Sequence, residues 1–155
     1  MNQILDGARI ILCVSFLIYA SWSDYKTREV SNKVWVIMGP SALALTVFQF
    51  VFCSVETIQL LQFYVLSFAI TSVLVVAIFY AGGFGGADAK ALMCIALALP
   101  VYPGYLLSEP AGFVSPLFPL TVFTNGILLG ALTVFYAFFR NILWKVRHGG
   151  GFFEG

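Results

Sequence analysis

Charged residues divide the chain into five long apolar stretches that contain no Asp, Glu, Lys or Arg. They are Ile10–Ser23, Val34–Val55, Thr57–Ala87, Ala91–Ser108 and Pro110–Phe139. A helix that spans a bilayer needs roughly 17–25 mainly apolar residues, so the last four stretches are long enough unaided. The first reaches that length when Asp6 and Arg9 are included. The pattern therefore predicts five transmembrane helices.

The two charges ahead of the first stretch fit a helix that continues through them. Asp6 and Arg9 are three residues apart, a spacing that lets side chains pair on one helical face. We expect both at the membrane edge, where such side chains reach the headgroups. The alternative is a cleaved signal peptide over residues 1–23, but this segment lacks a cationic start, and we expect a retained span.

The predicted fold class is all-α, a polytopic integral membrane helical bundle with a Gly-rich break before the fourth helix. Open strands are excluded because backbone groups in hydrocarbon must be satisfied within their own segment. Composition agrees, since the 155 residues include only eight basic and seven acidic ones and 61% are hydrophobic. An ordinary soluble domain is about a quarter charged, and a disordered chain is more polar still.

Charge and cysteine spacing limit the ligands that this chain can bind. A formal net charge of +1 is too small for electrostatic binding of nucleic acid, so we expect no nucleic-acid partner. The cysteines are scattered and the single histidine stands apart from them, which does not match the clustered ligands of a zinc site. We therefore expect no metal and no cofactor, and membrane lipid as the surroundings.

The basic residues predict the orientation in the membrane. With the amino terminus outside, seven of the eight Lys and Arg residues face the cytoplasm, and only Arg9 lies outside. We expect residues 1–140 to form a membrane-embedded domain and residues 141–155 a basic, Gly-rich cytoplasmic tail that begins a soluble stretch. All three tryptophans fall beside a predicted cytoplasmic boundary, where indoles are enriched: Trp22, Trp35 and Trp144.

Two polar segments are not explained by this topology alone. Asp24 follows the first apolar stretch directly, and Asp88 follows the sequence GGFGG at residues 82–86. Each of these four glycines destabilises a helix by up to about 1 kcal/mol relative to alanine, so the third helix should end here. Two membrane crossings separate Asp24 from Asp88, which puts both carboxylates at the inner face.

Each aspartate considered alone has a simpler explanation. Asp24 would be a loop residue paired with Lys26 or Arg28, and Asp88 would be the N-cap of the fourth helix, where aspartate is common. Their placement at the same membrane face, with the glycine break beside one of them, favours a paired site instead.

These residues carry a resemblance to a known family. The segment Gly85–Asp88, in the context GGFGGADAK, resembles the motif of the GxGD aspartyl peptidases. Together with Ser23–Asn32, SDYKTREVSN, it resembles the type IV prepilin peptidase family, specifically its archaeal branch of preflagellin and prepilin peptidases. Ala87 stands where other GxGD peptidases have glycine, and the archaeal branch accepts an apolar residue there.

The resemblance implies a membrane aspartyl endopeptidase with Asp24 and Asp88 as its catalytic pair. Its substrates would be archaellin or type IV pilin-like precursors, in which a short basic leader precedes a hydrophobic helix, cut at the cytoplasmic membrane face. One carboxylate would act as general base for a water and the other, protonated, would polarise the scissile carbonyl. The other motif residues are expected beside the substrate: Gly85, Gly86, Ala87, Lys90, Arg28, Glu29 and Asn32.

Alternatives remain for these residues and for the whole chain. Arg28, Glu29 and Asn32 also fit a plain basic loop with a turn, and Lys90 fits a membrane anchor. For the whole chain, one alternative is an intramembrane GxGD protease that cuts within transmembrane helices, which deeper aspartates would favour. The other is a protein without enzymatic activity, either a small transporter or a scaffold.

Overall fold

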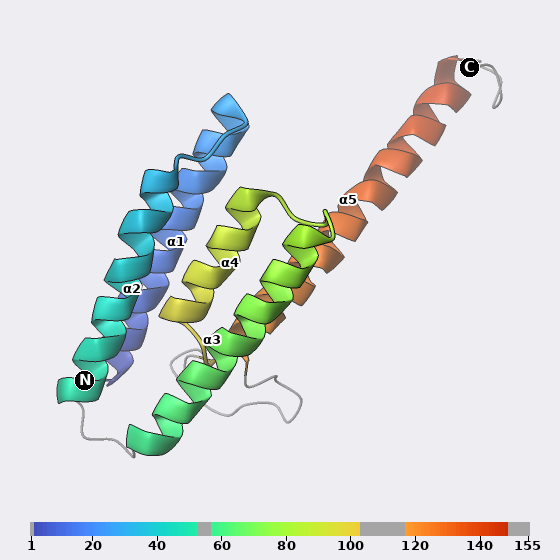
Figure 1. The fold of residues 1–155 in the computed structure, drawn as a ribbon. Coiled ribbons are helices and arrows are strands. Elements are labelled where there is room, and N and C mark those ends of the chain that lie inside the picture. Colours follow the sequence, from blue (N-terminus) through green and yellow to red (C-terminus); the bar gives the residue numbers. More distant parts are fainter. Residues whose placement is uncertain (1, 53–56, 103–116, 149–155) are drawn as a thin grey trace. The chain divides into compact units, whose positions relative to one another are not determined.

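The computed structural model describes residues 2–52, 57–102 and 117–148, and these are helical almost throughout (Figure 1). The helices are α1 (Asn2–Thr27), α2 (Asn32–Phe52), α3 (Thr57–Tyr80), α4 (Gly86–Ala98) and α5 (Phe118–His148). The only extended pairing within the described residues is an isolated antiparallel bridge between Val101 and Leu117. The prediction of an all-helical bundle is confirmed.

Four of the helices are long and apolar enough to cross a membrane, and α4 is shorter than predicted. The long segments are Ile4–Thr27, Asn32–Phe52, Leu61–Tyr80 and Phe118–Arg147. Helix α4 has 13 residues, so it is about 20 Å long, less than the hydrocarbon core. It begins before the expected stretch, at Gly86, and ends just before Pro100, which cannot continue a helix. The rest of that stretch, residues 103–108, lies outside the described residues.

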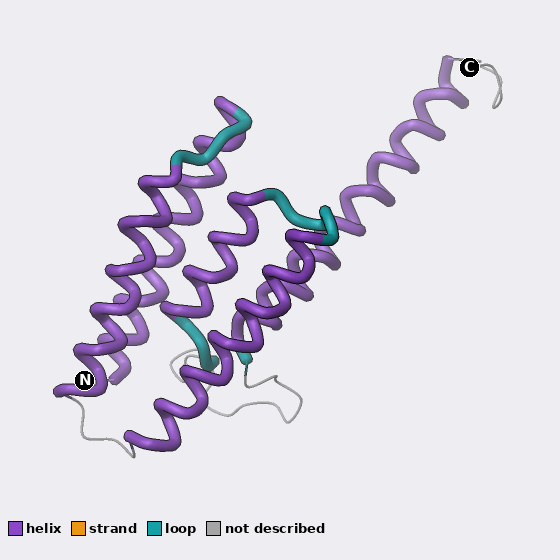
Figure 2. The backbone as a smooth tube through the Cα atoms, in the orientation of Figure 1, coloured by secondary structure: helices purple, strands orange, loops and turns teal. Residues whose placement is uncertain are grey.

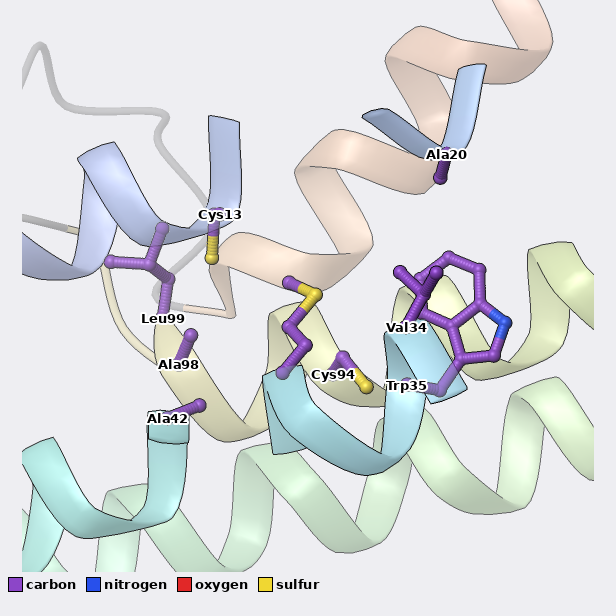
Figure 3. Close-up of a cluster of buried hydrophobic side chains, with 9 residues drawn as sticks. Cys13, Ala20, Val34, Trp35, Ala42, Cys94, Ala98 and Leu99 are labelled. Carbon is purple, nitrogen blue, oxygen red and sulfur yellow. The ribbon is translucent and has the colours of Figure 1, made fainter. Parts of the chain in front are cut away.

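Helix α4 is the central element of the first of two compact units, residues 1–120. It packs against α1, α2 and α3, and its side chains are largely buried from Leu92 onward. Figure 3 shows the core that this packing forms, with side chains from α1, α2 and α4. Small side chains such as Ala42 and Ala98, both fully buried, let the helices approach closely. The position of α4 therefore depends on three neighbours.

The structure corrects the expected position of Arg9. Its side chain is only 2% exposed, because it points into the bundle rather than toward headgroups. The guanidinium donates hydrogen bonds to the hydroxyl of Tyr64 on α3 and, at 3.4 Å each, to the Leu45 carbonyl and Thr46 Oγ1 on α2. The predicted pair with Asp6 is present at 3.8 Å. A charge buried among apolar helices is costly unless it is paired, and these partners supply that pairing.

The second unit, residues 121–155, consists of the greater part of α5. The helix continues past residue 140, to His148. Apolar residues surround the axis of this helix, and it is long and apolar enough to cross a membrane. The Gly-rich part of the predicted tail, residues 149–155, lies outside the described residues.

Candidate active site

Asp24 lies in the last turn of α1, and the chain reverses direction immediately after it. Arg28 adopts a left-handed conformation, φ +58°, and its N–H donates to the Asp24 carbonyl at 2.8 Å, which closes the helix end. Two hydroxyls then hold the turn: Ser23 Oγ donates to the Glu29 carbonyl at 3.0 Å, and Thr27 Oγ1 lies 2.9 Å from the same oxygen. The segment after Asp24 is therefore tied back onto the end of α1.

The glycine-rich segment ends α3 as predicted and presents Asp88 on the next helix. Gly82, with φ +76°, occupies the left-handed position of a Schellman motif. The N–H groups of Gly82 and Gly83 bond to the carbonyls of Phe79 and Ile78 at 3.0 and 2.9 Å. Helix α4 then begins at Gly86, which makes Asp88 its third residue.

One cavity contains both aspartates. Both short loops, between α1 and α2 and between α3 and α4, lie at the same end of the first unit (Figure 2). The cavity between them has a volume of about 520 Å³. Seven of the nine predicted site residues line it: Asp24, Arg28, Glu29, Gly85, Gly86, Ala87 and Asp88. Residues 64 positions apart in the sequence are thus brought to one site, as the topology predicted.

The simpler explanations for the two aspartates do not hold in this structure. Within the described residues, neither side chain forms an ion pair or a hydrogen bond. Lys26, an expected partner of Asp24, instead places its ammonium 4.7 Å from the centre of the Trp22 ring. The N-cap of α4 is Gly85 rather than Asp88. Both carboxylates are exposed to the cavity, so they are available to a water or a ligand.

Gly85 allows the Asp88 carboxylate to fold back over the start of its own helix. A Cβ atom added at Gly85 would lie 3.2 Å from Asp88 Oδ2, closer than most such contacts. Any larger residue at this position would displace the carboxylate or the backbone beside it. The glycine of the motif therefore has a steric role at the site.

The remaining two predicted residues do not line the cavity but bind each other. Lys90 Nζ donates a hydrogen bond of 2.6 Å to Asn32 Oδ1. Lys90 is two residues beyond Asp88 on α4, and Asn32 is the first residue of α2. The bond connects the two motif segments beside the cavity.

Several residues of the cavity wall were not predicted from the sequence, above all Trp35. This residue was expected at the headgroup level but is only 7% exposed, lies in the core shown in Figure 3 and lines the cavity. On α1, the lining residues Leu17, Ala20 and Ser21 precede Asp24 by seven, four and three positions. That spacing marks one helical face, so it could have identified them.

Comparisons with known proteins agree with the motifs. Residues 11–144 match the sequence profile of the type IV leader peptidase family. The chain is 32% identical over 132 residues to the preflagellin peptidase of Methanococcus voltae, which covers 81% of this chain and 54% of that protein. It is 29% identical over 139 residues to the preflagellin peptidase of Methanococcus maripaludis strain C6, covering 84% and 57%. The chain thus spans about half the length of these curated relatives. No solved structure gives a significant match.

Proposed function

Since the chain belongs to the type IV leader peptidase family, we propose that it is a membrane aspartyl endopeptidase with Asp24 and Asp88 as its catalytic pair. Its substrates are archaellin or type IV pilin-like precursors, and it removes their short basic leader at the cytoplasmic membrane face. The observation that carries the proposal is the single cavity lined by both carboxylates, neither of which has a partner among the described residues.

The two carboxylates divide the chemistry of peptide hydrolysis between them. One ionised carboxylate takes a proton from a water molecule, which attacks the scissile carbonyl, while the protonated carboxyl donates a hydrogen bond to the carbonyl oxygen. The C–N bond of the resulting tetrahedral intermediate then breaks as the carboxyl group that took the proton from water gives it to the leaving nitrogen.

The walls of the cavity suit an extended peptide that continues as an apolar helix. Gly85 and Gly86 carry no side chain, so a substrate backbone can approach Asp88 closely. An apolar groove on the exposed face of α1 shares Leu17 and Ser21 with the cavity and runs away from Asp24 along the membrane span. The leader would lie at the cavity and the hydrophobic helix of the precursor along this groove.

The position of the aspartates within their helices favours cleavage at a membrane boundary over cleavage inside a transmembrane helix. Asp24 is in the last turn of α1 and Asp88 in the first turn of α4. A protease that cuts in the middle of the bilayer would be expected to carry its carboxylates nearer the middle of its own spans.

The test is co-expression of the chain with a preflagellin-like and a pilin-like precursor, with leader removal followed as a mobility shift. Asp24→Asn and Asp88→Asn should each lower the cleavage rate at least about 100-fold, because each removes one acid–base group. Asp6→Asn is the matched control, since Asp6 lies outside the cavity and should retain cleavage. Full cleavage by either the Asp24→Asn or the Asp88→Asn variant would contradict the proposal. Failure of the wild-type chain to cleave either precursor would also contradict it.

A further inference from the structure

The bond between Lys90 and Asn32 is a tertiary contact between the two motif segments, over a separation of 58 residues. We infer that this pair is a positioning device that holds Asp88 opposite Asp24, so that both carboxylates act on one peptide bond. Neither residue needs to touch substrate for this role. The inference rests on the proposed function where its test measures cleavage, and on the structure alone where its test measures proximity.

The start of α4 consists mainly of small residues, of which Ala87 packs against the core. It follows a segment rich in glycine, whose backbone is permissive, and its first four residues are Gly86, Ala87, Asp88 and Ala89. Three of these have at most a methyl group as side chain, so they bury little surface against a neighbour. The buried residues of α4 begin later, at Leu92. Lys90 is thus the first long side chain after Asp88, and its contact fixes the near end of the helix.

The other end of the bond lies just after a hydrogen-bonded turn. Asn32 begins α2 one turn after the reversal that Ser23 and Thr27 hold against the end of α1. That reversal starts at the Asp24 carbonyl, which accepts the Arg28 N–H. The contact therefore links the helix of Asp88 to the same short segment that contains Asp24, and not to a distant part of the bundle.

Lys90 acts through the helix and not by direct contact with Asp88. The two residues are two positions apart on α4, so their side chains point to different faces. The ammonium reaches away to Asn32, whose oxygen is a good acceptor for a charged donor. Because both side chains are exposed, water competes for the bond, and we expect its loss to lower cleavage about three- to tenfold.

The first test is a double-mutant cycle on cleavage kinetics. Lys90→Met and Asn32→Leu should each lower kcat about three- to tenfold with KM nearly unchanged, because neither side chain lines the cavity. The double variant should be no slower than either single variant. Asn32→Asp, which keeps the acceptor, should leave kcat near the wild-type value when Lys90 is present, and should show the three- to tenfold loss when combined with Lys90→Met. Lys33→Met, one residue along α2 and unbonded to α4, is the matched control.

The second test measures proximity without relying on catalysis. In a chain whose own cysteines are replaced, Asp24→Cys and Asp88→Cys are combined, and the rate of intramolecular coupling by a short bis-maleimide is followed. Adding Lys90→Met should slow coupling, whereas adding Lys33→Met should not. Unchanged coupling, or additive losses of kcat in the cycle, would overturn the inference. If the two aspartates prove dispensable for cleavage, the proposed function fails, but the coupling rates still test whether Lys90 and Asn32 position Asp88.

Discussion

Replacing Arg9 with methionine tests the buried polar network near the start of α1. Met has a similar length but no donor, so Arg9→Met removes the hydrogen bonds to Tyr64, Leu45 and Thr46 without opening a large cavity. The hydroxyl of Tyr64 retains one partner, the oxygen of Gln49 at 3.2 Å. The substitution therefore removes the links that α1 makes to α2 and α3 through this side chain.

The expected loss of stability follows from the number of bonds and their burial. Hydrogen bonds within membrane bundles contribute about 0.6 kcal/mol each on average and up to about 1.7. Three bonds to a guanidinium that is 2% exposed thus predict a loss of roughly 2–5 kcal/mol. For a chain of this length, that corresponds to a fall in Tm of roughly 5–15 °C.

The assay is thermal unfolding of the purified chain in detergent or nanodiscs, followed by tryptophan fluorescence. Asp6→Asn is the control, because the Asp6–Arg9 pair at 3.8 Å is partly exposed and should contribute less than about 1 kcal/mol. Combining Arg9→Met with Tyr64→Phe should cost less than the separate losses added together, since both act on one bond. An unchanged or raised Tm for Arg9→Met would refute the view that this network stabilises the bundle.

Five further substitutions, at four positions, have outcomes that the helix ends and glycines predict. Gly82→Ala should lower the free energy of unfolding by about 1 kcal/mol in the same assay, because φ is +76° at this position. Gly7→Ala should raise it by about 1 kcal/mol, because Gly7 lies in a helix with open space around it. Gly85→Ala should slow leader cleavage about tenfold with little change in Tm, because the added methyl group displaces the carboxylate of Asp88. A normal cleavage rate would refute the steric role of Gly85. Arg28→Gly should keep or raise Tm, because glycine adopts the left-handed conformation of this position without strain. Arg28→Val should instead lower the free energy of unfolding by about 1–2 kcal/mol.

Several features of the fold could be predicted because they depend on residues that are close in sequence. Apolar stretches of spanning length predicted the helices, and the glycines before Asp88 predicted the end of α3. The length of α4 was harder to predict. Its apolar stretch continues past Pro100, so hydropathy alone extended the helix beyond the residue that stops it.

The candidate site likewise has some features that could be predicted from the sequence and others that could not. Alternation of helices across a membrane predicted that Asp24 and Asp88 share one face, and the structure brings them to one cavity. Neither residue type nor spacing could distinguish the motif residues that line the cavity from those that do not. Arg28 and Glu29 line the cavity, but Asn32 turns to Lys90, and that choice depends on the distance between two helices.

Length, hydropathy and short motifs are local properties, so they were enough to predict an all-helical membrane protein of the type IV leader peptidase family. Which polar groups meet depends on how the helices pack. Arg9 is buried because Tyr64, 55 residues away, offers it a partner, and Lys90 binds Asn32 over 58 residues. Trp35 lies in the core rather than at the headgroups because α1 and α4 pack over it. Such pairings depend on helix packing, which no local pattern of residues specifies.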